Sequence, residues 1–292
     1  MEEKPALKWT GERYVPEITG NISLEHLHRY AYASEYVAAK TVLDIASGEG
    51  YGSALLAKKA THVYGVDIDT ESILHAKKKY KLSNLEFLEG SCTKIPLQDS
   101  SVDIVVSFET IEHIIDHDQM MFEIKRVLRP DGILIMSSPD RKEYSEATNQ
   151  KNPFHLKELN LQEYSELLSK YFSNVSILGQ RIIYCSALIS LKETIGTLKN
   201  YNIERISNHF DVNETLANPL YIIGICSEKK ISYLPGGFFE QDINNSESIL
   251  EYKKLVAYRD EEIEALKRNI ESLHNNKPLI SLASYLKSFK KK

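Results

Sequence analysis

The sequence has few cysteines and no long apolar run. Its three cysteines, Cys92, Cys185 and Cys226, form no Cys-x-x-Cys pair, so we expect neither a structural zinc site nor a disulfide framework. No stretch of about eighteen consecutive apolar residues occurs, and Met1–Pro5 is polar and begins no apolar signal core. These absences predict a reduced, cytoplasmic protein without a transmembrane segment.

The sequence also lacks a large excess of charge of either sign. It has 36 Lys and Arg residues and 41 Asp and Glu residues, a net charge of −5. This balance gives no general attraction to nucleic acid or to an anionic membrane. Hydrophobic residues make up 42% of the chain, which is enough for a substantial core. The length of 292 residues fits one large domain, or one domain with an extension.

Apolar runs alternate with amphipathic helical patterns from residue 41 to about residue 180. This alternation is typical of an α/β fold with a doubly wound, mostly parallel sheet. Seven strands are expected, near residues 41–46, 62–67, 85–89, 102–108, 132–138, 175–179 and 219–226. Helices are expected near residues 51–60, 70–80, 117–128 and 160–171. Residues 1–40 would form a cap, and the domain 41–230 would include a helical insertion at about 181–217.

The last part of the chain differs in composition from this domain. Residues 231–247 have the character of a linker. Apolar residues then recur at three- and four-residue spacing over 248–273, which is typical of a coiled coil or an exposed docking helix. A helix packed back on the domain is the alternative. Residues 279–292 form a basic tail that either makes weak contact with an anionic membrane surface or is solvated.

The segment from Val42 to Asp69 carries the clearest functional pattern. An apolar run ends in a turn that contains Gly48 and Gly50, and the next apolar run ends in Asp67. Glycine lets the main chain approach a ligand closely, and an acid that closes the following strand can accept hydrogen bonds from a ribose diol. The pattern predicts a nucleoside site at the carboxyl ends of parallel strands.

Two residues indicate which nucleoside binds there. A dinucleotide fingerprint needs a third glycine, but Ser53 stands at that position. Asp44, ahead of the turn, would repel a diphosphate but would attract an amino-acid ammonium group by roughly 1–4 kcal/mol at contact distance. S-adenosylmethionine carries such a group, and the segment resembles motif I of class I S-adenosylmethionine-dependent methyltransferases. A dehydrogenase is the alternative that Asp44 and Ser53 disfavour.

Further motifs extend the resemblance over about residues 42–140. A Gly-x-x-x-x-Ile-Pro loop at 90–96, a Val-Asp strand and Glu112-His113 follow in the order found in the group that includes ubiquinone and menaquinone methylases. Where that group usually has Asp, this chain has Ser91. The resemblance implies that Asp67 binds the ribose and that Ser91 and the backbone of Cys92 hold the adenine. The residues expected to bind the cofactor are Arg29, Tyr30, Asp44, Ala46, Gly48, Gly50, Asp67, Ile68, Ser91, Cys92 and Phe108.

Two other segments narrow the resemblance. Residues 9–32 and the run Asn-Pro-Phe-His-Leu-Lys-Glu-Leu at 152–159 look like parts of methyltransferases found in bacterial surface-polysaccharide gene sets, often beside or fused to glycosyltransferases. This implies a carbohydrate or sugar-nucleotide acceptor, with a second copy or a glycosyltransferase as a partner through the C-terminal helix. Two alternatives stay open. One is methylation of a small hydrophobic acceptor such as a quinone precursor, and the other is an interaction module that recruits partners through 248–273.

Methyl transfer to a hydroxyl needs close alignment and a group that takes up the proton. His113 is the first candidate for this base because it follows a strand end and imidazole titrates near neutral pH. His155 is the second candidate, in a loop before the helix expected at 160–171. Glu109 could orient either imidazole or bind a hydroxyl. For each histidine the alternative is a structural side chain bonded to the backbone.

Residues near the amino terminus complete the expected site. Arg29, beside Tyr30, is expected to pair with the methionine carboxylate of the cofactor. Arg13 competes for this role, or could hold an acidic acceptor such as a sugar phosphate. His26 and His28 have no acid cluster at ligand spacing beside them, so no metal site is expected.

Overall fold

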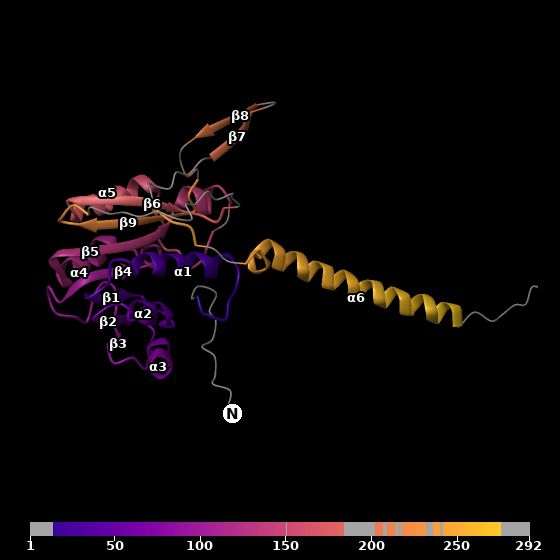
Figure 1. Ribbon diagram of the computed structural model, residues 1–292, viewed down its shortest axis with the longest axis horizontal. Helices are drawn as coiled ribbons and strands as arrows, with labels where there is room; N and C mark the ends of the chain where they lie inside the picture. Colours follow the sequence, from indigo (N-terminus) through magenta and orange to yellow (C-terminus); the bar gives the residue numbers. More distant parts are fainter. Residues whose placement is uncertain are drawn as a thin grey trace, which may run out of the picture. The chain divides into compact units, whose positions relative to one another are not determined.

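The computed structural model describes residues 14–149, 151–183, 202–206, 209–213, 216, 218–231, 236–239 and 242–275. The chain divides into two compact units, Met1–Glu240 and Gln241–Lys292. In the first unit, helices flank a central sheet (Figure 1). The described part of the second unit contains a short 3-10 turn at Ile243–Asn245 and one long helix.

The sheet of the first unit has seven strands in the order β3-β2-β1-β4-β5-β9-β6. The strands are β1 Thr41–Ile45, β2 His62–Asp67, β3 Leu85–Glu89, β4 Val102–Ser107, β5 Leu128–Pro139, β6 Asn174–Gln180 and β9 Tyr221–Ser227. β1 to β5 pair in parallel, and β9 is antiparallel to β5 and β6. The strand order reverses between β1 and β4, where a doubly wound sheet binds its ligand. The predicted fold class is confirmed.

Helices cover both faces of this sheet. They are α1 Asn21–Ala33, α2 Tyr51–Leu56, α3 Thr70–Lys79, α4 His117–Val127 and α5 Leu161–Tyr171. Successive side chains of a strand point to opposite faces. Val42 therefore packs in one cluster with Tyr30 of α1 and Leu56 of α2, whereas the next residue, Leu43, packs in the other with Ile124 of α4. Burial on both faces explains why the strands read as continuous apolar runs.

Polar caps begin several helices just after a strand or loop. Asp69 caps α3 by accepting from the backbone N–H groups of Glu71 and Ser72. Asn160 caps α5 and forms a reciprocal capping box with Glu163. Such caps satisfy backbone donors that would otherwise lack a partner at the first turn. They fix where each helix starts relative to the strand end before it, and so position the loops that carry the site.

The segment 202–213 departs from the prediction of a helical insertion at about 181–217. Residues Asn202–Ile206 (β7) and His209–Asn213 (β8) form an antiparallel pair instead. Ile203 and Val212 are Cα register partners in this pair, and β-branched residue types favour strands over helices. For these residues the predicted helix is wrong. Residues 184–201 lie outside the described residues.

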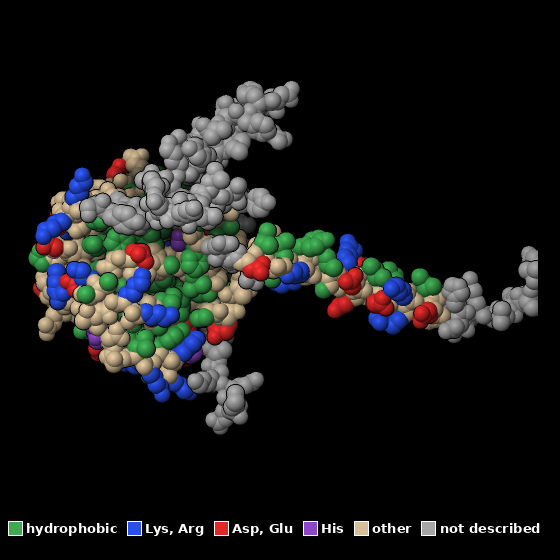
Figure 2. All heavy atoms as spheres, viewed as in Figure 1, with side chains coloured by type: hydrophobic (Ala, Val, Ile, Leu, Met, Phe, Trp, Pro, Cys, Tyr) green, Lys and Arg blue, Asp and Glu red, His purple; other side chains and the backbone are tan. Residues whose placement is uncertain are grey.

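The second unit contains helix α6, Glu247–Asn275, where a helix is predicted over 248–273. Tyr252, Val256, Ile263 and Leu266 are exposed on this helix, and hydrophobic side chains follow its length between charged ones (Figure 2). Pairing into a coiled coil remains a prediction. The basic tail at 279–292 lies outside the described residues. Across the described segments, every helix is too short or too polar to span a membrane.

Candidate active site

The turn after β1 contains three small residues in the left-handed backbone region. Ala46, Gly48 and Gly50 have φ angles of 59°, 54° and 92°. A Cβ atom on Gly50 would lie 2.8 Å from the ring of Phe87, so this position requires glycine for its contacts as well as for its backbone. The positions of the turn that need a left-handed backbone are therefore 46, 48 and 50. Ser53 lies inside α2, one turn beyond them.

Asp67, the last residue of β2, holds this turn in place. Its carboxylate accepts a hydrogen bond from the N–H of Gly48 at 2.7 Å and another from the N–H of Asp69 at 2.9 Å. Two predicted cofactor residues, Gly48 and Asp67, are thus joined directly across neighbouring strands. Ile68 follows, and its apolar side chain is 73% exposed. It offers a surface on which a flat ring could pack beside the acid.

Asp44 is fully buried beneath the turn. Its carboxylate accepts hydrogen bonds from Ser53 Oγ at 2.6 Å and from the hydroxyl of Tyr30 at 3.1 Å. Burial, with a smaller contribution from the charge of Asp67, raises the pKa of Asp44 from 3.8 to about 7 against the opposing effect of these two donors. Tyr30 reaches Asp44 across Gly52, where a Cβ atom would lie 2.0 Å from the tyrosine ring. A cationic ligand group nearby would favour the ionised carboxylate.

Arg29 is buried beside the predicted orienting residue Glu109. Its Nε donates to Gln180 at 2.7 Å, Nη1 lies 3.3 Å from Glu109 Oε1, and the guanidinium stacks 4.3 Å above the ring of Tyr221. Both Nη atoms are buried and lack a hydrogen-bond partner among the described residues. The structure therefore places Arg29 against Glu109, and its pairing with a methionine carboxylate remains a prediction. Arg13, the competitor, lies outside the described residues.

Three further predicted cofactor residues lie in the loops after β3 and β4. Ser91 Oγ hydrogen-bonds to Thr93 Oγ1 at 2.8 Å and accepts from the N–H of Thr93 at 3.2 Å. Cys92 is buried, and burial raises the pKa of its thiol to about 11. Phe108 packs edge-to-face on Tyr30 with ring centroids 5.0 Å apart. All three follow the carboxyl ends of β3 and β4, at the same edge of the sheet as the turn after β1, as a shared ligand site requires.

A buried carboxylate, Glu112, lies in the short 3-10 helix Ile111–His113 beyond β4. Its side chain is 1% exposed, and Oε2 has no hydrogen-bond partner among the described residues. Burial, together with the charge of Glu109, holds the pKa of Glu112 well above its usual value. The carbonyl oxygen of Glu112 accepts from the N–H groups of Leu156 and Lys157 at 2.8 and 3.0 Å. These bonds bring the loop at 152–159 to the end of β4.

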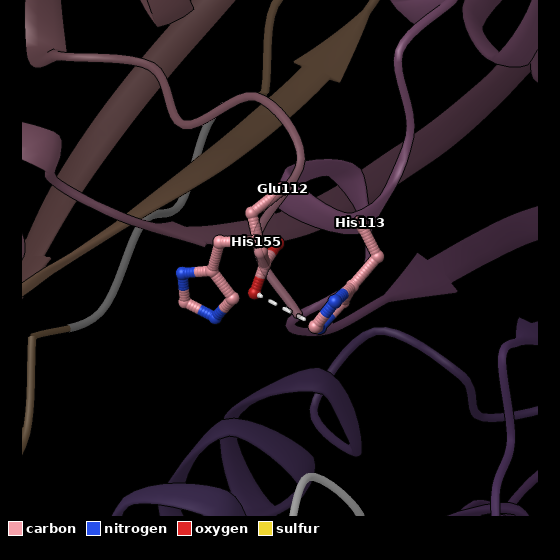
Figure 3. Close-up of side chains that lie close together, drawn as sticks. All are labelled: Glu112, His113 and His155. Carbon is pink, nitrogen blue, oxygen red and sulfur yellow. Dashed lines mark ion pairs between the residues drawn. The ribbon is translucent and has the colours of Figure 1, made fainter. Parts of the chain in front are cut away.

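The two predicted bases, His113 and His155, therefore lie together. Their ring centroids are 5.1 Å apart, and the Glu112 carboxylate lies between the two rings (Figure 3). His113 Nδ1 is 3.0 Å from the carbonyl oxygen of Phe154, and His113 Nε2 is 3.9 Å from Glu112 Oε1. His155 Nδ1 lies 2.5 Å from Glu158 Oε1. Glu158, three residues after His155, is a member of the site that the sequence did not predict.

Glu109, His26 and His28 also contact neighbouring side chains. Glu109 has a left-handed backbone, with φ of 49°, and its Oε1 accepts from Ser137 Oγ at 2.6 Å. His26 and His28 lie outside the histidine pair. His26 hydrogen-bonds to the hydroxyl of Tyr51 at 2.9 Å, and burial holds its pKa well below the usual value. His28 stacks on another aromatic ring.

The fold, and the turn after β1 that Asp67 holds in place, are typical of an α/β domain that binds a nucleoside. Residues 43–136 match the model of a family described as a methyltransferase domain. The chain is 38% identical over 166 residues to a Mycolicibacterium smegmatis protein named as an S-adenosylmethionine-dependent methyltransferase, covering 56% of this chain and 64% of that protein. It is 37% identical over 99 residues to the demethylmenaquinone methyltransferase of Chlorobaculum tepidum, covering 34% and 40%.

The match spans less than two thirds of either relative's length. A structure of the Trm112 methyltransferase activator of Haloferax volcanii with a methyltransferase shares the fold, with 17% identity, a TM-score of 0.51 and coverage of 72% of this chain and 91% of that chain. Residues 43–136 of the first unit are thus a methyltransferase domain, similar to class I S-adenosylmethionine-dependent methyltransferases. S-adenosylmethionine is the cofactor of this class.

Proposed function

We propose that this protein transfers a methyl group from S-adenosylmethionine to a hydroxyl of a carbohydrate, either a nucleotide-linked sugar or a component of a surface glycan. The observation that carries the proposal is the polar cluster beyond β4, in which Glu112 lies between His113 and His155 (Figure 3). Glu112 Oε2 is buried and has no hydrogen-bond partner among the described residues, so a hydroxyl-rich acceptor suits this cluster because one of its hydroxyls can donate to that oxygen. An apolar acceptor would leave Glu112 Oε2 unsatisfied.

The proposed reaction is an in-line displacement. The bond between the methyl carbon and the sulfonium sulfur breaks, sulfur keeps the electron pair, and the acceptor oxygen bonds to the methyl group. Alignment of the two reactants supplies up to about 7–11 kcal/mol in well-oriented systems. The hydroxyl proton passes to His113, or to His155 as the second candidate, and such base catalysis contributes about 10²–10⁴-fold. Glu109, held by Ser137 and Arg29, would bind or orient the acceptor.

A small hydrophobic acceptor such as a quinone precursor is the second candidate. It is favoured by the similarity to the Chlorobaculum demethylmenaquinone methyltransferase and by the side chains of Phe154 and Leu156, which are 50% and 60% exposed beside His155. A role in partner recruitment is favoured by the exposed apolar side chains of α6. The partner would be a second copy or a glycosyltransferase, with methyl transfer retained.

Methyl incorporation from radiolabelled S-adenosylmethionine separates the two acceptors. The full chain is incubated with nucleotide sugars, lipid-linked glycans and demethylmenaquinone, and the labelled product is identified by mass spectrometry. Label on a sugar oxygen supports the proposal, and label on the quinone alone overturns it in favour of the second candidate. The Asp67→Ala variant serves as the control for transfer that does not depend on the cofactor site.

A further inference from the structure

We propose that Glu112, His113 and His155 bind a divalent transition-metal cation and leave part of its coordination shell open to a ligand hydroxyl. Each residue offers one donor atom, and the three atoms lie within 4.8 Å of one another (Figure 3). Donors bound at about 2.0–2.2 Å from a zinc-like ion are roughly 3–3.5 Å apart. Side-chain shifts of about 1 Å would therefore close the group around a cation.

The two imidazoles are already oriented as metal-binding histidines are. A ligating histidine usually directs its second ring nitrogen to a carboxylate or a backbone carbonyl, which fixes the tautomer. His113 Nδ1 faces the carbonyl oxygen of Phe154 at 3.0 Å, and His155 Nδ1 faces Glu158 Oε1 at 2.5 Å. With Nδ1 protonated in each ring, Nε2 carries the lone pair. His155 Nε2 lies 3.0 Å from the side-chain amide of Asn152, and a cation would replace this contact.

Glu112 supplies the independent evidence for a ligand at this position. Its side chain is 1% exposed, and its Oε2 atom is buried without a hydrogen-bond partner among the described residues. An unpaired carboxylate oxygen that is removed from water is costly unless a cation or a donor meets it. The carboxylate lies between the two imidazole rings. A cation bound by both rings would satisfy this oxygen.

The donor set indicates which cations fit. Two imidazole nitrogens and one carboxylate oxygen suit Zn²⁺, Mn²⁺, Fe²⁺ and Ni²⁺ better than Ca²⁺ or Mg²⁺, which prefer oxygen alone. Three protein ligands leave one or more positions open, as in catalytic metal sites. Glu112 is fixed by the N–H groups that bind its carbonyl oxygen, so its backbone is already placed for this role.

The role of the cation in methyl transfer rests on the proposed function. A hydroxyl bound at an open position of the cation loses its proton to solvent more readily, as metal-bound water does. The same oxygen then bonds to the methyl carbon while sulfur keeps the electron pair of the broken bond. His113 and His155 would act as ligands in this form of the reaction, and the acceptor would be held by the cation.

Calorimetric titration of the chelator-treated full chain with Mn²⁺ and with Zn²⁺ tests the site. We expect about one cation per chain, and an affinity at least about tenfold weaker in the Glu112→Gln and His155→Ala variants, since loss of a supporting residue alone costs 10–100-fold. The matched control is His62→Gln, which removes a histidine of β2 outside the cluster and should leave cation affinity unchanged. Equal affinities in wild type, Glu112→Gln and His155→Ala would overturn the proposal.

Titration of the same samples with S-adenosylmethionine distinguishes the possible failures. Variants that bind the cofactor as wild type does are folded, so a loss of cation binding in them reports on the site. Cofactor binding without stoichiometric cation binding by the wild-type chain overturns the metal site and leaves the proposed function intact. Cation binding at this site without methyl transfer to any sugar overturns the proposed function and leaves the metal site intact.

Discussion

The backbone N–H of Gly48 donates a 2.7 Å hydrogen bond to the carboxylate of Asp67. The turn after β1 and the end of β2 therefore form one structural unit, and the acid that would bind the ribose is also the acid that shapes the turn. Asp67 Oδ1 is held in turn by the N–H of Asp69 at 2.9 Å. Cofactor binding and the local backbone should respond together to changes at this residue.

We predict that Asp67→Ala weakens S-adenosylmethionine binding by about 10–100-fold, since hydrogen bonds to a charged group are worth about 1.5–3 kcal/mol. Asp67→Asn keeps one acceptor oxygen and should lose less. Isothermal titration calorimetry measures both affinities, with NAD as a ligand that should give no heat. An unchanged affinity in Asp67→Ala would show that the ribose binds elsewhere.

Gly52 is predicted to be necessary for the contact between Tyr30 and Asp44. A Cβ atom at position 52 would lie 2.0 Å from the Tyr30 ring, so Gly52→Ala should lower the free energy of unfolding by about 1–3 kcal/mol, as overpacking does. The matched control is Gly236→Ala, because a Cβ atom there meets nothing within 4 Å. Its effect should stay within about 0.5 kcal/mol. Urea unfolding measures both variants, and equal stabilities would contradict this packing.

The cofactor half of the site could be predicted from the sequence because its residues are consecutive or end adjacent strands. Apolar runs that finish in Gly48 and Asp67 place both residues at one sheet edge. The role of Ser53 as a donor to Asp44 could not be predicted, because it depends on the pitch of a helix six residues long. The sequence showed only that Ser53 stands where a dinucleotide fingerprint has its third glycine.

The second half of the site was only partly predictable. His113 and His155 were candidates individually, but their contact depends on the hydrogen bonds between Glu112 and the loop at 152–159, which no local pattern reveals. From the sequence, Glu112 is identified only as the residue before His113 in the Glu-His motif. Its burial, and hence its value as a metal ligand, follows from the tertiary packing.

Cofactor binding should depend on pH through Asp44. Its pKa of about 7 in the free domain means that it must release a proton below pH 7 to pair with the ammonium group. The affinity for S-adenosylmethionine should therefore fall as pH decreases from 8 to 5, approaching tenfold per pH unit. Asp44→Asn should bind more weakly at pH 8 and show no such slope. Calorimetry across this pH range measures the slope, and a parallel slope in Asp44→Asn would assign it to another group.

Asp44 should also make the free energy of unfolding depend on pH, but in the opposite direction to the cofactor affinity. Its pKa is raised above the usual 3.8, so the folded cofactor-free protein binds more protons than the unfolded chain between about pH 4 and pH 7. The contribution of Asp44 to the free energy of unfolding therefore decreases as pH rises through this window. The free energy of unfolding of wild type relative to Asp44→Asn, measured by urea unfolding, should therefore fall as pH rises from about 4 to 7 and level off above pH 7. A constant difference would contradict the raised pKa.

His113→Ala should slow methyl transfer far more than it weakens cofactor binding. Whether His113 takes the proton directly or holds a cation, its loss removes the means of deprotonating the acceptor, worth about 10²–10⁴-fold in rate. Single-turnover measurements give the rate, and calorimetry gives the affinity for S-adenosylmethionine. His62→Gln, which changes a histidine outside the cluster, should retain both. Unchanged turnover in His113→Ala would exclude the residue from the reaction.

The apolar side chains of α6 are predicted to mediate self-association. Ile263, Leu266 and Ile270 are 48–55% exposed, whereas Lys267 pairs with Glu264 at 2.7 Å on the charged part of the helix. Leu266→Glu places a charge in the apolar seam and should dissociate the assembly, because a coiled coil excludes unpaired charge from its core positions. Lys267→Glu introduces the same residue outside the seam and should leave the mass unchanged.

Deletion of 241–292 should also give the monomer mass while cofactor affinity is retained, since these residues form a separate unit. Light scattering coupled to size exclusion measures all three, and a wild-type chain that is already monomeric at tens of micromolar would refute this role of α6.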